Sequence, residues 1–172
     1  NFNRRGGMMF TQPAADTLPH SGRGTMGKYA SRVRKLPAFA GEYPVAALSE
    51  EITTPGEGQI KAMVIGGGNP VLTTTNGKQL DDAFTQLDFV VAVDFYVTET
   101  SRHADIILPP VTALERDHYD VVFHNFAVRN SAKFSPALFT QEAGSKTDWQ
   151  IYLGLAERMD KLNGKATEHY AT

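Results

Sequence analysis

Short apolar runs recur along the chain after residue 57 and predict the strands of a sheet. They occupy residues 60–65 (IKAMVI), 89–93 (FVVAV) and 105–108 (DIIL). Glycines follow the first run, an aspartate follows the second, and a proline pair ends the third. A short apolar run that ends in such residues is typical of a strand buried on both faces of a parallel sheet. We therefore predict three buried strands.

Helical patterns separate these runs. Residues 77–87 carry apolar side chains at positions i, i+3, i+4 and i+7, which predicts an amphipathic helix. The polar residues 98–104 fit a short helix before the third strand. This strand–helix–strand–helix–strand order predicts a parallel sheet with right-handed crossovers. The predicted fold class is α/β, a Rossmann-like three-layer domain with a mainly parallel sheet, preceded by an irregular segment.

The segment before residue 56 has a different character. It is rich in glycine and proline, and its basic residues at 21–35 show no helical periodicity, although residues 46–52 favour a short helix. So long a segment without regular structure is unusual inside a compact domain. We therefore expect residues 1–55 to be an irregular segment that packs on other parts of a larger protein. Residues 56–172 would form the Rossmann-like domain.

The C-terminal part contains one further helix. Residues 113–138 mix polar and apolar positions and predict a strand or an extended loop. Residues 147–162 place their apolar side chains on one stripe, which predicts an amphipathic helix. Ser145 and Asp148 form an S-x-x-D start pattern for this helix, and Gly164 is suited to its end.

Composition narrows the classes of function. With 172 residues, 41% of them hydrophobic, the chain can bury an ordinary globular core. A net charge of −2 without a basic stripe gives no reason to expect nucleic-acid binding. The apolar runs are too short to cross a bilayer. The absence of cysteine excludes disulfides, thiolate metal sites and iron–sulfur ligation within this chain.

The histidines do not suggest a metal site. None of the 5 histidines has the spacing of a metal-binding pair, so we predict no metal ligand in this chain. His103 and Arg102 lie between the second and third predicted strands, which leaves a role in ligand binding open.

The end of the first predicted strand is a candidate binding loop. Ligands of open parallel sheets bind outside the carboxyl ends of the strands. The run GGGNP follows this strand, and the backbone amides of Gly67 and Gly68 would be able to face a phosphate. Asn69 can both donate and accept hydrogen bonds. The alternative is a tight turn in which glycine, asparagine and proline have no further role.

Three charged residues complete the candidate site. Asp94 ends the second strand and is suited to accept two N–H groups of a purine such as guanine, or alternatively to cap the helix near Thr98. Arg116, on a loop after the third strand, would neutralise a phosphate or be an ordinary surface charge. Asp148 would contact a ligand or cap its helix.

These motifs match a known family. The pattern G-x-I-K-A-M-V-I-G-G-G-N-P followed by a helix and by L-D-F-V-V-A-V-D-F-Y-V-T-E-T-S-R-H-A-D-I-I-L-P covers residues 58–109. It resembles the molybdopterin oxidoreductases of the dimethyl sulfoxide reductase superfamily, which includes formate dehydrogenases and bacterial nitrate reductases. The pattern D-W-x-x-x-x-x-L-A-x-R at residues 148–158 and the opening N-F-N-R-R-G-G extend the resemblance more loosely.

The resemblance implies a cofactor. The family holds molybdenum or tungsten with two pterin guanine dinucleotides, one bound by each of two Rossmann-like domains. By similarity, Asn69 and Asp94 would contact one dinucleotide, Asp94 through the guanine. Arg116 aligns with a position where relatives often have lysine, and Asp148 with a cofactor contact of the family.

The resemblance also implies that parts of the enzyme are missing from this chain. The metal ligand of the family, and the iron–sulfur cluster of many members, come from upstream domains. The chain is therefore interpreted as an internal fragment, inactive alone, of a parent enzyme that resembles formate dehydrogenase. Its partners would be the remaining domains of the parent, and the fragment is expected to self-associate. We expect a cytoplasmic location, with the periplasm as the alternative.

Two other hypotheses remain open at this stage. One is a stand-alone module that binds a guanine nucleotide without redox activity. The other is an interaction domain without a ligand.

Overall fold

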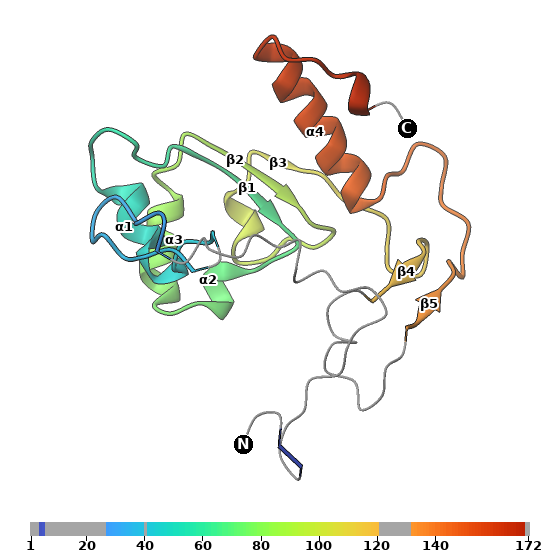
Figure 1. Cartoon of the computed structure of the whole chain (residues 1–172), viewed down its shortest axis with the longest axis horizontal. Coiled ribbons are helices and arrows are strands. Elements are labelled where there is room, and N and C mark those ends of the chain that lie inside the picture. The colour runs from blue at the N-terminus through green and yellow to red at the C-terminus, as the bar shows by residue number, and fades with distance from the viewer. Residues whose placement is uncertain (1–3, 6–26, 40, 121–131, 171–172) are drawn as a thin grey trace.

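A three-stranded parallel sheet forms the centre of the protein (Figure 1). The computed structural model describes residues 4–5, 27–39, 41–120 and 132–170. The strands are β1 (Ala62–Gly66), β2 (Phe89–Val93) and β3 (Ile106–Ile107), in the order β1-β2-β3. Both pairs are parallel, and Gly66 lies opposite Val93. The three apolar runs thus form the predicted strands, and the predicted α/β class with a parallel sheet is confirmed.

Four helical elements precede or connect the strands of this sheet. They are α1 (Leu48–Thr53), α2 (Pro70–Thr73), α3 (Gly77–Phe84) and the 3₁₀ helix η3 (Ser101–His103). A 3₁₀ turn, η2 (Val45–Ala47), precedes α1. The helix predicted for residues 77–87 is therefore present but ends at Phe84. The helix α2 was not predicted, because proline at its first position is also an ordinary turn residue.

The hydrophobic core lies between one face of the sheet and these helices. Side chains alternate between the faces of a strand, so Ile65 and Val90 point into the core. They pack with residues of α1, α2 and α3: Ile52, Val71, Leu80, Ala83 and Phe84. The apolar stripe predicted for α3 is the face that is buried.

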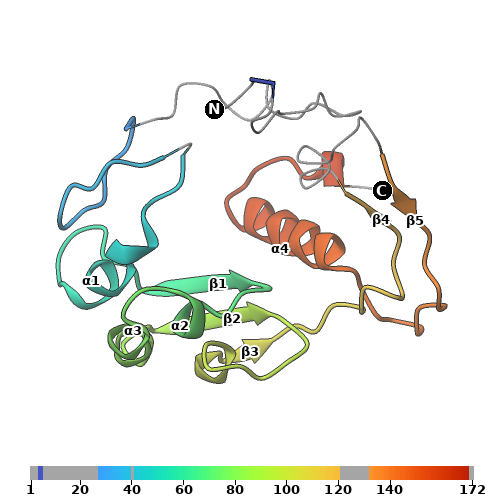
Figure 2. The ribbon, with the colours of Figure 1, turned by 90° about the horizontal axis from the view of Figure 1, so that it is seen from below.

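The opposite face of the sheet is partly open. Val64 is 55% exposed, Phe89 44% and Ile106 45%. The prediction that the strands are buried on both faces is therefore wrong for these positions, because no helix packs closely over them among the described residues. Figure 2 shows α4 on this side, away from α2 and α3. No residue of α4 is buried.

The part of the N-terminal segment around Arg32 packs against α1. Arg32 donates to the carbonyl oxygen of Thr54 at 2.6 Å, and its Nε lies 3.3 Å from a carboxylate oxygen of Glu51. Glu51 also accepts from the amide of Val33 at 2.8 Å. Because α1 contributes Ile52 to the core, the end of this segment is built into the domain. The boundary at residue 55 stays a prediction.

A small hairpin and the last helix follow the sheet. The strands β4 (His118–Tyr119) and β5 (Phe134–Ser135) pair antiparallel within the region predicted as strand or extended loop. Residues 121–131 of that region lie outside the described residues. The long helix α4 (Asp148–Leu162) forms as predicted, and a 3₁₀ turn, η5 (Glu168–Tyr170), comes after it.

The start of α4 differs from the prediction. Its N-cap is Thr147, whose hydroxyl accepts from the amide of Gln150, while the Gln150 side chain accepts from the amide of Thr147 at 2.9 Å. Ser145 donates instead to the carbonyl oxygen of Glu142. The S-x-x-D pattern was therefore out of register by two residues. Gly164 adopts a positive φ of 68° just beyond the helix, as a C-terminal glycine does.

We expect Thr147→Ala to destabilise the protein, because it removes one half of this capping box. The loss should be about 1 kcal/mol in the free energy of unfolding. Urea denaturation of the variant measures it. Ser145→Ala is the matched control and should change the free energy by less than about 0.5 kcal/mol. Equal losses in the two variants would contradict the observed cap.

Candidate functional site

A cavity of about 530 Å³ opens at the carboxyl edge of the parallel sheet. Residues at or just after the carboxyl ends of the three strands line it, together with residues from the first turns of α4. These residues are Gly66, Gly67, Val93, Asp94, Phe95, Pro110, Val111, Ala113, Arg116, Asp148 and Tyr152. Parallel strands end at the same edge, so the cavity is where ligands of such sheets bind.

Four of the six residues proposed from the sequence meet in this cavity. Gly67, Asp94, Arg116 and Asp148 all line it, although as many as 81 positions separate the first from the last. Gly68 and Asn69 are not among the lining residues.

The end of β1 makes the wall of the cavity beside α4. The hydroxyl of Tyr152 lies so close to Gly66 that a Cβ there would collide with it. Gly67 has a positive φ of 56°, which favours glycine, and its amide donates to the Val93 carbonyl at 2.9 Å. The Gly67 amide, expected to face a phosphate, is therefore already used within the sheet.

Tyr152 is a cavity residue that the sequence analysis missed. It lies one helical turn after Asp148, so the spacing i, i+4 on the predicted helix would have placed the two side chains together. Burial raises the pKa of the Tyr152 phenol above its ordinary value of 10.0, and the Asp148 carboxylate raises it further. The phenol is therefore neutral at physiological pH and available as a hydrogen-bond donor.

The Asp94 carboxylate lines the cavity and has one oxygen available to accept a hydrogen bond from a ligand. Its Oδ1 accepts from the amide of Tyr96 at 3.1 Å, a local turn that holds the carboxylate in place. The turn that leads into η3 is instead held by Thr98 and Ser101. The side-chain oxygen of each residue accepts from the amide of the other, and their hydroxyls share a hydrogen bond. The alternative that Asp94 caps this helix is therefore not observed. Within the described residues, its second oxygen has no hydrogen-bond partner.

Arg116 and Asp148 form an ion pair across the cavity wall. Arg116 Nη1 lies 3.0 Å from Asp148 Oδ1, and each side chain is about one-third exposed, at 32% and 38%. Asp148 Oδ1 also accepts from the amide of Trp149 at 3.0 Å. With Asp94, the cavity holds two carboxylates and one guanidinium. Its local charge therefore favours groups rich in hydrogen-bond donors.

Asn69 bonds away from the cavity. Its Oδ1 accepts from the hydroxyl of Thr100 at 2.7 Å, and its Nδ2 donates to Glu99 Oε2 at 2.6 Å. The hydrogen bond from Asn69 is the main reason that the pKa of Glu99 lies below its ordinary value of 4.5. Asn69 is therefore tied to the turn after β2.

Arg102 and His103 are tied to α3. Arg102 Nη2 lies 2.6 Å from Asp81 Oδ2, and His103 Nε2 lies 2.6 Å from Asp81 Oδ1. The hydrogen bond from Arg102, followed by that from His103, lowers the pKa of Asp81 below its ordinary value of 3.8. This arrangement favours a role in joining η3 to α3 over contact with a ligand.

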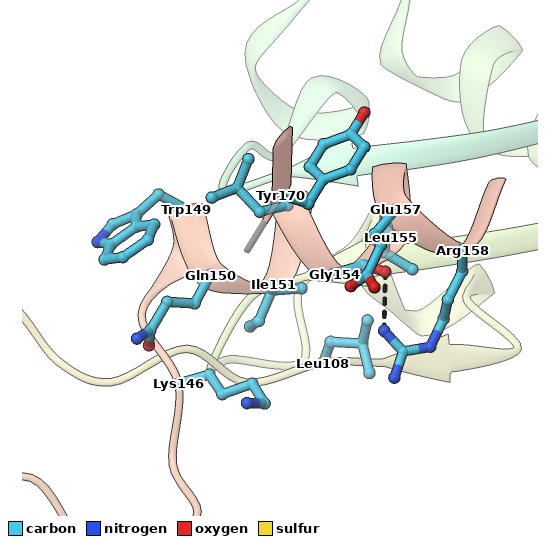
Figure 3. Close-up of a pocket in the computed structure, with 11 residues that line it drawn as sticks. Leu108, Lys146, Trp149, Gln150, Ile151, Gly154, Leu155, Glu157, Arg158 and Tyr170 are labelled. Atoms are coloured by element: carbon cyan, nitrogen blue, oxygen red, sulfur yellow. Dashed lines mark hydrogen bonds between the residues drawn. The ribbon is translucent and has the colours of Figure 1, made fainter. Parts of the chain in front are cut away.

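A second cavity of about 550 Å³ lies beneath α4 (Figure 3). Ile151 points from the helix toward Leu108, and Arg158 donates to the carbonyl oxygen of Gly154 at 2.8 Å. The residues proposed from the sequence all lie outside this space.

Across the described parts of the chain, no three metal-ligating side chains gather, and no helix is both long and apolar enough to cross a membrane.

Comparison with known proteins defines the class. The model of the molybdopterin oxidoreductase family matches residues 8–158, which is most of the chain. The chain therefore belongs to the molybdopterin oxidoreductase family. The superfamily resemblance seen in the strand-end motifs is confirmed.

Several oxidoreductases are similar to this chain. Formate dehydrogenase H of Escherichia coli is 32% identical over 127 residues, covering 74% of this chain and 16% of that protein. Dimethyl sulfoxide/trimethylamine N-oxide reductase of Cereibacter sphaeroides is 32% identical over 104 residues, covering 59% and 12%. The catalytic subunit of the assimilatory nitrate reductase of Bacillus subtilis is 30% identical over 106 residues, covering 61% and 14%. The chain spans only 10% to 18% of the length of such relatives.

Proposed function

We propose that this chain is a cofactor-binding part of a molybdenum or tungsten oxidoreductase that carries two pterin guanine dinucleotides. The observation that carries the proposal is the convergence of Gly67, Asp94, Arg116 and Asp148 on one cavity at the carboxyl edge of the sheet. Family membership supports the pterin cofactor. In this proposal, residues 56–172 form a Rossmann-like domain that binds one dinucleotide.

The chemistry of the donor set suits the guanosine end of such a cofactor. Guanine presents adjacent N–H donors, and the unbonded oxygen of Asp94 would accept from them. Arg116 would approach the nearest phosphate, and the Asp148 carboxylate would accept from ribose hydroxyls. The cavity has two carboxylates and one guanidinium, so its net negative charge would repel the diphosphate. We therefore do not place the whole diphosphate in this cavity. A volume of about 530 Å³ lies within the usual range for a small-molecule site.

The bound cofactor and the residues of this chain would have different roles. When bound, the metal–pterin group supplies the oxidation and reduction chemistry. The residues of this chain bind and orient one end of it, and Tyr152 and Gly66 shape the wall beside α4. Asn69 and Gly68 belong to the same loop, which they would help to hold in place.

The rest of the parent enzyme would supply what this chain lacks. The metal ligand and any iron–sulfur cluster would lie in other domains, and the substrate would resemble that of a formate dehydrogenase. The open sheet face at Val64, Phe89 and Ile106 suits the docking of such domains. The chain by itself would be inactive and prone to self-association.

Chemical analysis of the protein purified at its natural length tests this proposal. We expect molybdenum or tungsten, together with GMP released when acid hydrolyses the dinucleotide. The GMP content should be about twice the metal content, because the family cofactor has two dinucleotides per metal. Protein that binds GDP but contains neither metal nor pterin would overturn the proposal and favour a stand-alone guanine-nucleotide module.

A further inference from the structure

The loop that follows β1 is held by a fully buried hydroxyl on the side away from the cavity. Thr100 has an exposure of 0%. Its Oγ1 donates to Asn69 Oδ1 at 2.7 Å and accepts from the amide of Val71 at 3.0 Å. A buried hydroxyl that both donates and accepts satisfies two other polar groups, which would lose their partner without it.

These bonds join the ends of two neighbouring strands. Asn69 follows β1, and Thr100 follows β2. The carbonyl oxygen of Asn69 accepts from the amides of Leu72 and Thr73, so the same residue also begins α2. Fixing Asn69 therefore fixes both the glycine loop and the start of the helix behind it.

The same loop is held on its cavity side by the sheet itself. The Gly67 amide donates to the carbonyl oxygen of Val93, the residue before Asp94. The loop is thus anchored at two points, one at the cavity and one in the buried interior. Because the Gly67 anchor uses only backbone atoms, Thr100 is the anchor that a side-chain substitution can remove.

We propose that Thr100 is a positioning residue for the cofactor. Its hydroxyl, acting through Asn69 and Val71, keeps Gly66 and Gly67 in the conformation that forms the cavity wall beside Asp94. Thr100 does not line the cavity, so it acts on the cofactor only through this loop. The inference rests on the proposed function of the cavity.

A role limited to stability makes a different prediction. If Thr100 only supports the core, its replacement should weaken cofactor retention no more than another buried substitution with the same loss of stability. If it positions the loop, retention should fall further than the loss of stability explains, and a residue that restores the hydroxyl should restore retention.

The experiment compares Thr100→Val, Thr100→Ser and Val90→Ala in the protein expressed at its natural length. Val90 is 1% exposed and packs in the core on β2, so it serves as the matched stability control. The readouts are the thermal midpoint and the half-life of bound guanine nucleotide after dilution. We expect Thr100→Val to shorten the half-life about tenfold, because it removes both hydrogen bonds of the buried hydroxyl. Thr100→Ser should stay within about twofold of wild type.

Asn69→Ala provides a second route if Thr100→Val does not fold. This substitution removes the side chain that accepts from the Thr100 hydroxyl, and it leaves the fully buried Thr100 itself unchanged. We expect a similar shortening of the half-life in Asn69→Ala alone. Where Thr100→Val does fold, combining the two substitutions should shorten the half-life by less than the product of the two effects. A normal half-life in Asn69→Ala, or multiplicative effects in the double variant, would overturn the linkage through Asn69.

Three results separate the failure of this inference from the failure of the proposed function. A normal half-life in Thr100→Val, combined with cofactor loss in Asp94→Ala, overturns the role of Thr100 and leaves the site in place. A half-life that falls equally in Thr100→Val and Val90→Ala, without recovery in Thr100→Ser, also overturns it. Normal retention in both Thr100→Val and Asp94→Ala overturns the proposed function itself.

Discussion

Asp94→Ala is expected to leave the purified protein with only a small fraction of its guanine nucleotide and metal. The variant removes the carboxylate that would accept from the guanine base at the end of β2. Hydrogen bonds to a charged group contribute about 1.5–3 kcal/mol each. Losing this recognition should weaken cofactor binding roughly a hundredfold or more. Metal analysis and nucleotide release, measured per mole of protein, report the loss.

Two further substitutions show whether the effect comes from the ligand. Asp88→Ala makes the same chemical change at the other end of β2, where the exposed side chain lies away from the cavity, and should leave cofactor content unchanged. Asp94→Asn keeps an oxygen for the amide of Tyr96 but loses the negative charge. We expect it to retain the local turn and still lose cofactor. A full complement of metal and nucleotide in Asp94→Ala would count against the site.

Gly77→Ala is expected to cause the largest loss of stability among single-methyl additions to the described part of the chain. A Cβ at Gly77, the first residue of α3, would collide with the carbonyl oxygen of Val71. That oxygen belongs to the backbone of α2, and Val71 packs in the core, so it cannot rotate away. The two helices would have to separate. Overpacking of this kind costs about 1–3 kcal/mol, which corresponds to a fall of roughly 2–12 °C in the thermal midpoint.

Gly154→Ala is the matched control for this substitution. Gly154 lies inside α4, where an added Cβ would meet only the end of the flexible Arg158 side chain. Replacing glycine by alanine within a helix stabilises by about 0.5–1 kcal/mol. The same chemical change should therefore have opposite signs at the two positions, as measured by thermal denaturation. A stable Gly77→Ala variant would contradict the packing of α2 on α3.

The fold could be predicted from the sequence because its strands and helices have strong local patterns. The runs that became β1 and β2 are uninterrupted, and the stripe on α3 has the helical period. Gly67, Gly68, Asn69 and Asp94 are candidate residues because they follow these strands. Parallel strands end at one edge, so the positions of Gly67 and Asp94 along the chain were sufficient to place them together.

Other features depended on contacts between residues that are distant in the sequence. The sequence showed that Asn69 is able to bond, but only the packing of the turn after β2 against the loop after β1 showed that it bonds to Thr100. The cap of α4 was placed at the wrong residue, because two overlapping capping patterns fit the same stretch. The exposure of Val64 depends on what covers the sheet.

Local sequence patterns specify the α/β class, the order of strands and helices, and the residues that stand at the strand ends. These properties follow from local periodicity and from the chemistry of individual residues. Which of those residues share a cavity, and which turn away from it, depends on how the elements pack in three dimensions. It paired Arg116 with Asp148, brought Tyr152 over Gly66, and buried Thr100 behind the loop. Such contacts depend on the distance between side chains in space, which the local pattern of a sequence does not contain.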